Sequence, residues 1–227
     1  MKITVLTLFP EMFSSLNCSI LGKAQEKKLL DINIVNIRDY STDKHKKCDD
    51  YPFGGGAGMV MMAQPIYDAF QAVKSEKTHT IFMSPSGKTL TQKRVVELSK
   101  LEDIVILCGH YEGVDQRVID LLVDEEISIG DYVLTGGELP AMCLIDSISR
   151  FIPNVLHSDE STQEESFSNG LLEYPQYTRP EDFMGIKVPS VLLSGHHKNI
   201  ENWKREKSVE KTMQVRPDLL KGDKYEN

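Results

Sequence analysis

The sequence predicts an α/β fold built on a parallel sheet, followed by a small helical domain. Short apolar runs rich in β-branched residues, at 104–108 and 127–134, alternate with segments of helical apolar spacing, at 114–123 and 138–152. A glycine-containing loop follows each run, GHYEG at 109–113 and TGGELP at 135–140. This order predicts parallel strands whose loops share the carboxyl edge of the sheet, where open α/β sheets bind ligands.

The remaining elements of the first domain continue this rhythm. Alternating or continuous apolar residues predict strands over residues 2–8, 32–37 and 80–83. Helical spacing predicts helices over residues 9–27, 65–73 and 91–101. The polar segment 38–51 is expected to be an exposed loop, and Ser84–Gly87 (SPSG) a third loop at the carboxyl edge.

Two glycine-containing segments suggest nucleotide binding, and both fail on spacing. FGGGAGM, at Phe53–Met59, would need glycine at Met59 or Met61 to make a dinucleotide fingerprint, and no strand precedes it. SGKT, at Ser86–Thr89, would need glycine in place of Phe82 to make a phosphate-binding Walker loop. ATP or GTP hydrolysis is therefore not expected.

Composition describes a globular protein without a membrane span. The 227 residues carry a net charge of −8, 40% are hydrophobic, and no apolar run reaches the roughly 18 residues that a spanning helix needs. The four cysteines form no CxxC pair, so neither a zinc site nor a disulfide framework is indicated. A cytoplasmic protein with reduced thiols is the expectation.

The last third of the chain changes character. An acidic, serine-rich segment is expected to be a mobile linker over residues 157–170, between a first domain at 1–156 and a helical domain at 171–227. A helix is predicted over residues 199–213, and the surrounding segment 195–217 has six basic and three acidic residues, a local charge of +3. This charge is typical of a phosphate-binding surface or, equally, of a solvated helix face.

Several motifs together resemble one enzyme family. The chain is similar to the bacterial tRNA (guanine-N1)-methyltransferases, of the knotted SPOUT class, in motifs that span nearly its whole length in one order: FGGGAGM at 53–59, SPSG at 84–87, CGHYEGVDQRV at 108–118, SIGDYVLTGGELPAM at 128–142, RFIP at 150–153, YPQYTRP at 174–180 and VPSVLLSGHH at 188–197. The resemblance implies a trefoil knot at the three loops and a homodimer whose active site is shared between subunits. It also implies dependence on Mg²⁺, for which no carboxylate cluster in the sequence assigns ligands.

The resemblance implies S-adenosyl-L-methionine as methyl donor. The residues that would line its site are Ser84, Pro85, Gly109, Tyr111, Glu112, Gly113, Ile129, Gly130, Tyr132, Leu134, Gly136, Gly137 and Pro140. Glycine at such positions lets a ligand lie against backbone.

The implied reaction is methyl transfer to N1 of the guanosine on the 3′ side of a tRNA anticodon. N1 carries a proton, so a carboxylate base is expected, and a guanidinium would stabilise the charge that develops on O6. By position, Glu165 matches the carboxylate base and Arg150 matches the guanidinium. The family usually has aspartate where this chain has Glu165. The residues expected to bind tRNA phosphates are Lys198, Lys204, Arg205 and Lys207. The alternatives are a knotted methyltransferase for another RNA position and a catalytically silent RNA-binding protein.

Overall fold

The structure, a computed structural model, describes residues 1–156 and 165–221. The chain divides into two compact units, Met1–His157 (unit 1) and Ser158–Asn227 (unit 2). Residues 157–164 of the expected linker lie outside the described residues, so its predicted mobility stays a prediction.

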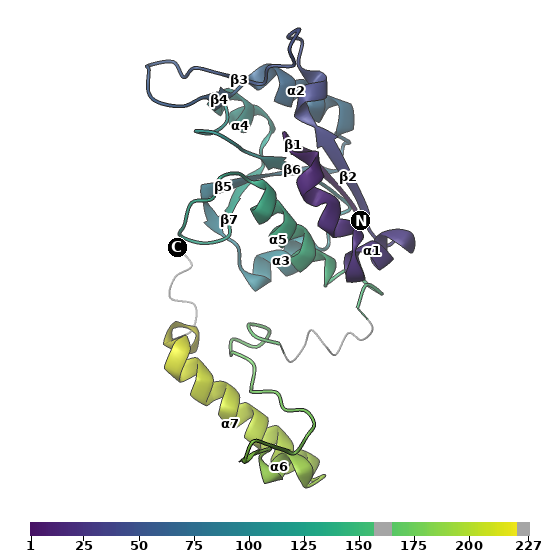
Figure 1. Cartoon of the computed structure of the whole chain (residues 1–227), viewed down its shortest axis with the longest axis vertical. Coiled ribbons are helices and arrows are strands. Elements are labelled where there is room, and N and C mark those ends of the chain that lie inside the picture. The colour runs from purple at the N-terminus through teal and green to yellow at the C-terminus, as the bar shows by residue number, and fades with distance from the viewer. Residues whose placement is uncertain (157–164, 222–227) are drawn as a thin grey trace. The chain divides into compact units, whose positions relative to one another are not determined.

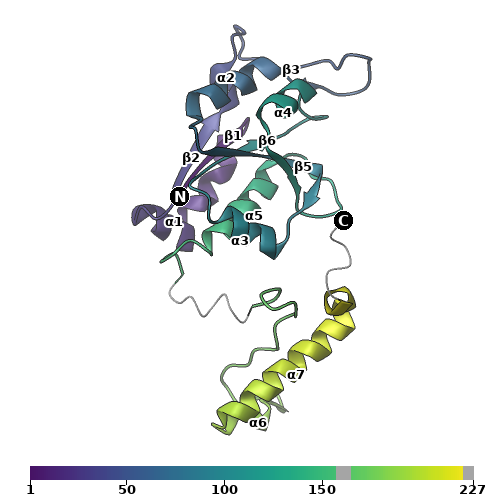
Figure 2. The same cartoon turned by 180° about the vertical axis from the view of Figure 1, so that it is seen from behind.

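Unit 1 is built on a five-stranded sheet in the order β2-β1-β6-β5-β7, and every neighbouring pair is parallel. The strands are β1 (Lys2–Thr7), β2 (Asp31–Asn36), β5 (Thr78–Thr89), β6 (Asp103–Cys108) and β7 (Glu125–Ser128). Figures 1 and 2 show helices on both faces of this sheet. The predicted α/β class with a parallel sheet is therefore confirmed.

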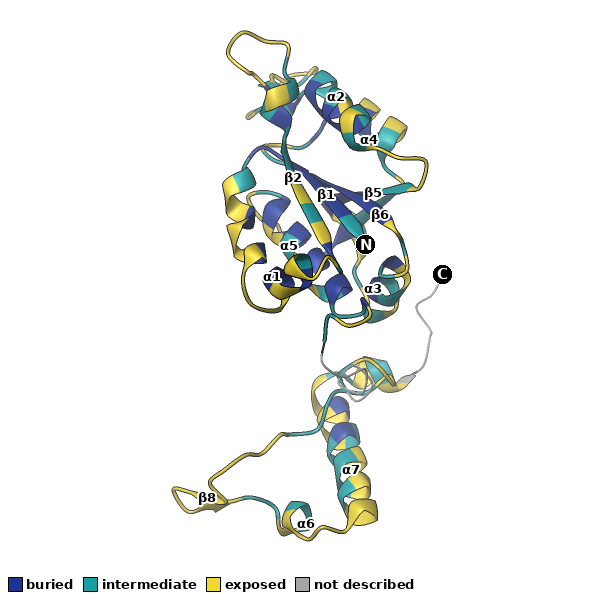
Figure 3. Ribbon diagram, turned by 90° about the vertical axis from the view of Figure 1, so that its right-hand side faces the viewer, coloured by how far each residue is buried: buried dark blue, intermediate teal, exposed yellow. Residues whose placement is uncertain are grey.

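The central strand β6 is buried along its whole length because helices cover both of its faces (Figure 3). Its side chains alternate between two cores: Ile104 and Ile106 pack toward α1, α3 and α5, whereas Val105 and Leu107 pack toward α2 and α4. The helices are η1 (Pro10–Asn17), α1 (Ser19–Glu26), η2 (Ile37–Tyr40), α2 (Ala63–Val73), α3 (Gln92–Leu98), α4 (Gln116–Leu122) and α5 (Glu138–Ser149). A short hairpin of β3 (Asp49–Asp50) and β4 (Val60–Met61) completes unit 1.

The prediction of a loop at Ser84–Gly87 is wrong, because these residues continue β5 to Thr89. Pairing with β7 is irregular between Met83 and Lys88, and Ser86 N–H donates to Ser84 Oγ at 3.2 Å. A side chain on Gly87 would begin 2.5 Å from the backbone of Glu126. Proline and glycine thus serve a bent strand and a close strand approach here, rather than a turn.

The strand predicted at 127–134 ends early, at Ser128. Gly130 has φ of +152°, and Ser128 Oγ both accepts from Gly130 N–H at 3.2 Å and donates to Gly130 O at 2.9 Å. These local bonds replace the sheet ladder, and residues 131–134 form an exposed loop.

The helix predicted at 9–27 is interrupted at Cys18, which is extended and separates η1 from α1. Cys18 N–H donates to Ser15 O, and Gly22 packs so closely on this corner that a side chain would begin 2.3 Å from Asn17 O. The other predicted helices and strands of unit 1 are confirmed with shifted ends.

Unit 2 contains one long helix, and the predicted helix at 199–213 is confirmed within it. Its elements are β8 (Asp182–Phe183), β9 (Ile186–Lys187), α6 (Ser190–Leu193), α7 (His197–Val215) and η4 (Pro217–Lys221). Leu172 N–H donates to Thr212 Oγ1 at 2.8 Å, which holds the extended chain against α7. Among the described residues of unit 2, only Ser208 and Thr212 are buried, so the described part of this unit has no apolar core of its own.

Candidate functional site

The loops that follow β6 and β7 meet at the carboxyl edge of the sheet. Gly137 N–H donates to Gly109 O at 2.9 Å, and His110 pairs with Gly136 as an antiparallel bridge. Between these loops and the bend of β5 lies a cavity of about 250 Å³. The three segments predicted to share one edge therefore surround one cavity.

Twelve of the thirteen residues predicted for the donor site line this cavity; Gly130 does not. Gly130 turns the loop toward Tyr132, whose ring would meet a side chain at position 130 at 2.6 Å. Seven further residues line the cavity and were not predicted from the sequence: Phe82, Met83, His110, Ile127, Ser128, Val133 and Thr135. Phe82 lies inside β5, two residues before Ser84, and Ile127 lies near the end of β7. The other five directly precede or follow a predicted residue, so the neighbouring motifs were the available signal for them.

Gly137 and Gly109 are required by close approach and not by unusual backbone angles. Gly137 has φ of −82°, yet a side chain there would begin 2.9 Å from Cys108 Cα. A side chain on Gly109 would begin 2.9 Å from the ring of Phe82. At these two positions the cavity wall is therefore backbone without side chains, against which a ligand can lie closely.

A buried carboxylate lies beneath this wall. Glu138, only 2% exposed, begins α5, and its Oε1 accepts a hydrogen bond of 2.8 Å from Thr7 Oγ1 at the end of β1. An acidic residue in the first helical turn is stabilised by the positive end of the helix dipole. Burial, followed by the charge of Glu138, raises the pKa of the Cys108 thiol well above its usual range, so Cys108 is an uncharged part of the core.

The segment after the glycine-rich loop is fixed to the GHYEG loop. Glu112 N–H donates to Met59 O at 3.0 Å, and Met61 N–H donates to Gly113 O at 2.9 Å. Gly58 lies so close to Glu112 that a side chain there would begin 2.4 Å from Glu112 Cγ. FGGGAGM therefore adjoins the rim of the cavity, while residues 53–58 are exposed.

Of the two predicted catalytic residues, Arg150 belongs to unit 1 and does not line the cavity. Arg150 follows the last turn of α5, whose twelve residues span about 18 Å from the cavity wall at Gly137. Glu165 belongs to unit 2, and its carbonyl accepts from Ser168 N–H at 3.2 Å. Both side chains are partly exposed.

The residues predicted to bind tRNA lie on α7. Lys198 and Arg205 are exposed. Lys204 pairs with Glu201 at 3.2 Å and lies 4.9 Å from the ring centre of Tyr174, and Lys207 pairs with Glu210 at 2.5 Å, which raises the pKa of Lys207. A cavity of about 410 Å³ beside them is lined by Asn169, Leu171, Tyr174, Glu201, Lys204, Arg205 and Ser208.

Within residues 1–156 and 165–221, no group of three or more His, Cys, Asp or Glu side chains converges on a metal site. Over the same residues, no helix combines the length and apolarity needed to cross a membrane.

Comparison with known proteins identifies the family. The tRNA (Guanine-1)-methyltransferase TrmD family model matches residues 1–222. Proteins named tRNA (guanine-N(1)-)-methyltransferase are similar to this chain over nearly their whole length. The protein of Ruminiclostridium cellulolyticum is 61% identical, and the match covers 97% of this chain and 96% of that protein. The protein of Alkaliphilus metalliredigens is 60% identical, with 98% of this chain and 92% of that protein covered, and the protein of Clostridioides difficile is 57% identical, with 97% of this chain and 98% of that protein covered. The chain belongs to the tRNA (guanine-1)-methyltransferase family.

Proposed function

We propose that the chain transfers a methyl group from S-adenosyl-L-methionine to N1 of the guanosine on the 3′ side of a tRNA anticodon. The observation that carries this proposal is the cavity, which twelve of the thirteen residues predicted for the donor site line, in a chain 61% identical to a tRNA (guanine-N(1)-)-methyltransferase. Because the substrate is tRNA, the expected compartment is the cytoplasm.

The donor supplies an electrophilic methyl group on a sulfonium, and the chain must orient it and remove a proton. The glycine walls at Gly109 and Gly137 fit a ligand held by peptide groups. As N1 forms its bond to the methyl group, Glu165 accepts the N1 proton and the sulfur leaves with its electron pair. Arg150 stabilises the negative charge that develops on O6.

The active site is proposed to be shared between two copies of the chain. Arg150 lies ten residues after Pro140, the last residue of α5 that lines the cavity, and this is roughly 15 Å of helix, more than an arginine side chain can reach. A second copy that brings its Arg150 and Glu165 to this cavity would complete the site. Lys198, Lys204, Arg205 and Lys207 of α7 would hold the tRNA phosphates.

Bulk tRNA and isotopically labelled donor test the reaction. After incubation with the protein, digestion and mass mapping should find new 1-methylguanosine on the 3′ side of anticodons. Methylation elsewhere would favour a different RNA position, and donor binding without methylation a silent RNA-binding protein. In single-turnover assays, Glu165→Gln should slow transfer by roughly 10²- to 10⁴-fold, and near-normal transfer would exclude Glu165 as the base.

A further inference from the structure

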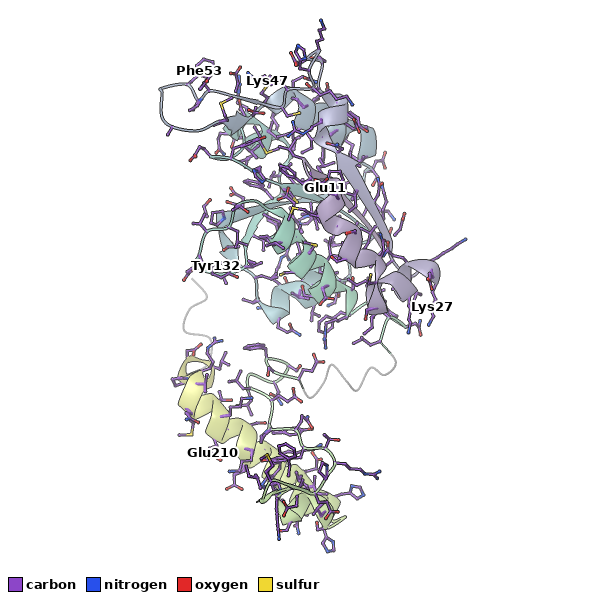
Figure 4. The ribbon with its side chains drawn as sticks, viewed as in Figure 1. Glu11, Lys27, Lys47, Phe53, Tyr132 and Glu210 are labelled. Atoms are coloured by element: carbon purple, nitrogen blue, oxygen red, sulfur yellow. The ribbon has the colours of Figure 1, made fainter. Side chains whose placement is uncertain are left out.

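The most exposed large apolar side chain is Phe53, in the glycine-rich loop beside the cavity. Its side chain is 100% exposed, and Tyr51, two residues earlier, is 78% exposed. Figure 4 shows Phe53 on a loop that projects from unit 1, on the same side of the unit as Tyr132 of the cavity. A partner that covers a phenyl ring removes apolar surface from water, which favours binding of a flat apolar group at this position.

The loop holds Phe53 at the corner of a turn. Gly55 N–H donates to Pro52 O at 3.3 Å, and Gly54 has φ of +89°, as the third residue of a type II turn requires. Side chains placed on Gly54 or Gly55 would have no neighbour within 4 Å. Phe53 is therefore presented on a narrow, open loop tip that leaves space for a flat partner on the ring.

The base of the same loop is fixed to the rim of the cavity. Five residues after Phe53, Gly58 contacts Glu112, and Met59 O accepts from Glu112 N–H. Five residues span at most about 18 Å, so the ring lies within a few nucleotides' length of the cavity rim. Phe53 can meet a residue that neighbours the methylated base, while the target base meets the donor at the mouth of the cavity.

The proposed chemistry determines what that neighbour offers. N1 lies on the Watson–Crick edge of guanine, so the target must be unpaired when it reacts, and unpaired bases stack on aromatic side chains. We propose that Phe53 is a stacking platform for an unpaired base next to the target guanosine. This inference rests on the proposed function. Because every base has a π-face, the contact is tolerant of base identity.

The test is a cycle of protein and tRNA changes. Phe53→Leu keeps an apolar side chain but removes the ring, and Phe53→Tyr keeps the ring. Each protein is assayed on intact tRNA and on two abasic tRNAs, one without the base on the 5′ side of the target and one without the base on the 3′ side. On intact tRNA, Phe53→Leu should lower kcat/KM by about 5- to 150-fold, the usual range for one base stack, and Phe53→Tyr should restore it. On one of the two abasic tRNAs, Phe53→Leu should cause no further loss.

Controls separate this contact from general damage. The affinity for S-adenosyl-L-methionine should be unchanged in Phe53→Leu, and Phe183→Leu, which removes a 64% exposed ring in unit 2, should leave kcat/KM unchanged. The proposal is overturned if Phe53→Leu is as active as wild type on intact tRNA, loses equally on all three tRNAs, or loses no more than Phe183→Leu. Absence of methylation by the wild-type protein would instead refute the proposed function.

Discussion

Gly137 shows how little space separates the cavity wall from the strand behind it. A Cβ at this position would lie 2.9 Å from Cys108 Cα, a backbone atom that cannot rotate away. We expect Gly137→Val to displace the wall and to weaken donor binding at least tenfold, as measured by calorimetric titration with S-adenosyl-L-methionine. Gly185→Ala, which strains a backbone with φ of +85° but meets no neighbour within 4 Å, is the control for replacing a glycine outside the cavity. Unchanged donor affinity in a folded Gly137→Val protein would contradict this role.

Two threonines on β1 form a matched pair for the buried carboxylate. Thr7 and Thr4 are both fully buried, but Thr7 donates to Glu138, whereas Thr4 Oγ1 has no hydrogen-bond partner among the described residues. Thr7→Val should lower the free energy of unfolding by about 1.5–3 kcal/mol, the value of a hydrogen bond to a charged group, and Thr4→Val should be neutral or stabilising. Urea unfolding of both variants measures this. An equal loss of unfolding free energy in the two variants would mean that the hydrogen bond from Thr7 to Glu138 does not stabilise the fold.

For single residues, sequence patterns predicted which residues line the cavity better than they predicted the contacts that require those residues. The glycines at 109, 136 and 137 were expected to bring backbone near a ligand, and they do line the cavity. Sequence spacing does not reveal that Gly137 must avoid Cys108, or that Thr7 reaches Glu138 across 131 positions. Such contacts depend on how separate strands and loops meet in space.

Three elements of unit 1 are joined by one carboxylate. Glu125 at the start of β7 accepts two hydrogen bonds from Arg94 of α3, at 2.5 and 3.1 Å, and lies 2.7 Å from Nε2 of His79 in β5. Burial raises the pKa of Glu125, but the hydrogen bonds from His79 and Arg94 lower it by more, to about 2. The network is therefore complete at neutral pH and is lost in acid.

The sign of this shift predicts an acid-sensitive contribution to stability. Because the pKa of Glu125 is lowered on folding from 4.5, its stabilisation is present above pH 4.5 and disappears as the pH falls toward 2. Glu125→Gln should therefore destabilise the protein more at pH 5 than at pH 3, by about 2 kcal/mol at most. Urea midpoints at both pH values measure this, with the exposed Glu76→Gln as control. If Glu125→Gln lowers the free energy of unfolding equally at pH 5 and pH 3, solvent screens the interaction of Glu125 with Arg94 and His79.

At the scale of elements, the errors occurred where side chains compete with the sheet ladder. Ser84–Gly87 has turn-forming residues but continues a strand, because β7 approaches Gly87 closely. The apolar run after Ser128 has strand-forming residues but leaves the sheet, because the Ser128 hydroxyl bonds to Gly130. Local propensity cannot decide either case without the neighbouring strand.

The shared site can be tested on the whole molecule by mixing two inactive variants. If the donor cavity of one copy works with Glu165 of the other, a mixed dimer of Gly137→Val and Glu165→Gln has one intact site. Equal amounts, mixed and allowed to exchange subunits, should recover about a quarter of wild-type activity, since half of the dimers are mixed and each has one of two sites. Each variant alone is the control. Absence of recovery despite confirmed subunit exchange would mean that both functions act within one chain.

At the scale of the whole molecule, the sequence predicted two differently built parts but not their construction. Unit 1 has two apolar cores, whereas the described part of unit 2 buries only Ser208 and Thr212. Composition alone could not indicate that the hydroxyl of Thr212 would hold the extended chain of unit 2 against α7. The trefoil knot stays a prediction of the resemblance.

The bonds that join the cavity walls are made by peptide groups, from Gly137 to Gly109 and between His110 and Gly136. Hydrogen bonds between peptide groups depend on the backbone alone, so we expect the fold itself to set the shape of the cavity that the donor enters. Little conformational entropy then remains to be lost from these walls on binding. Donor association should accordingly be a single rapid step without a slow isomerisation, and the slow, ordering part of the catalytic cycle should belong to tRNA.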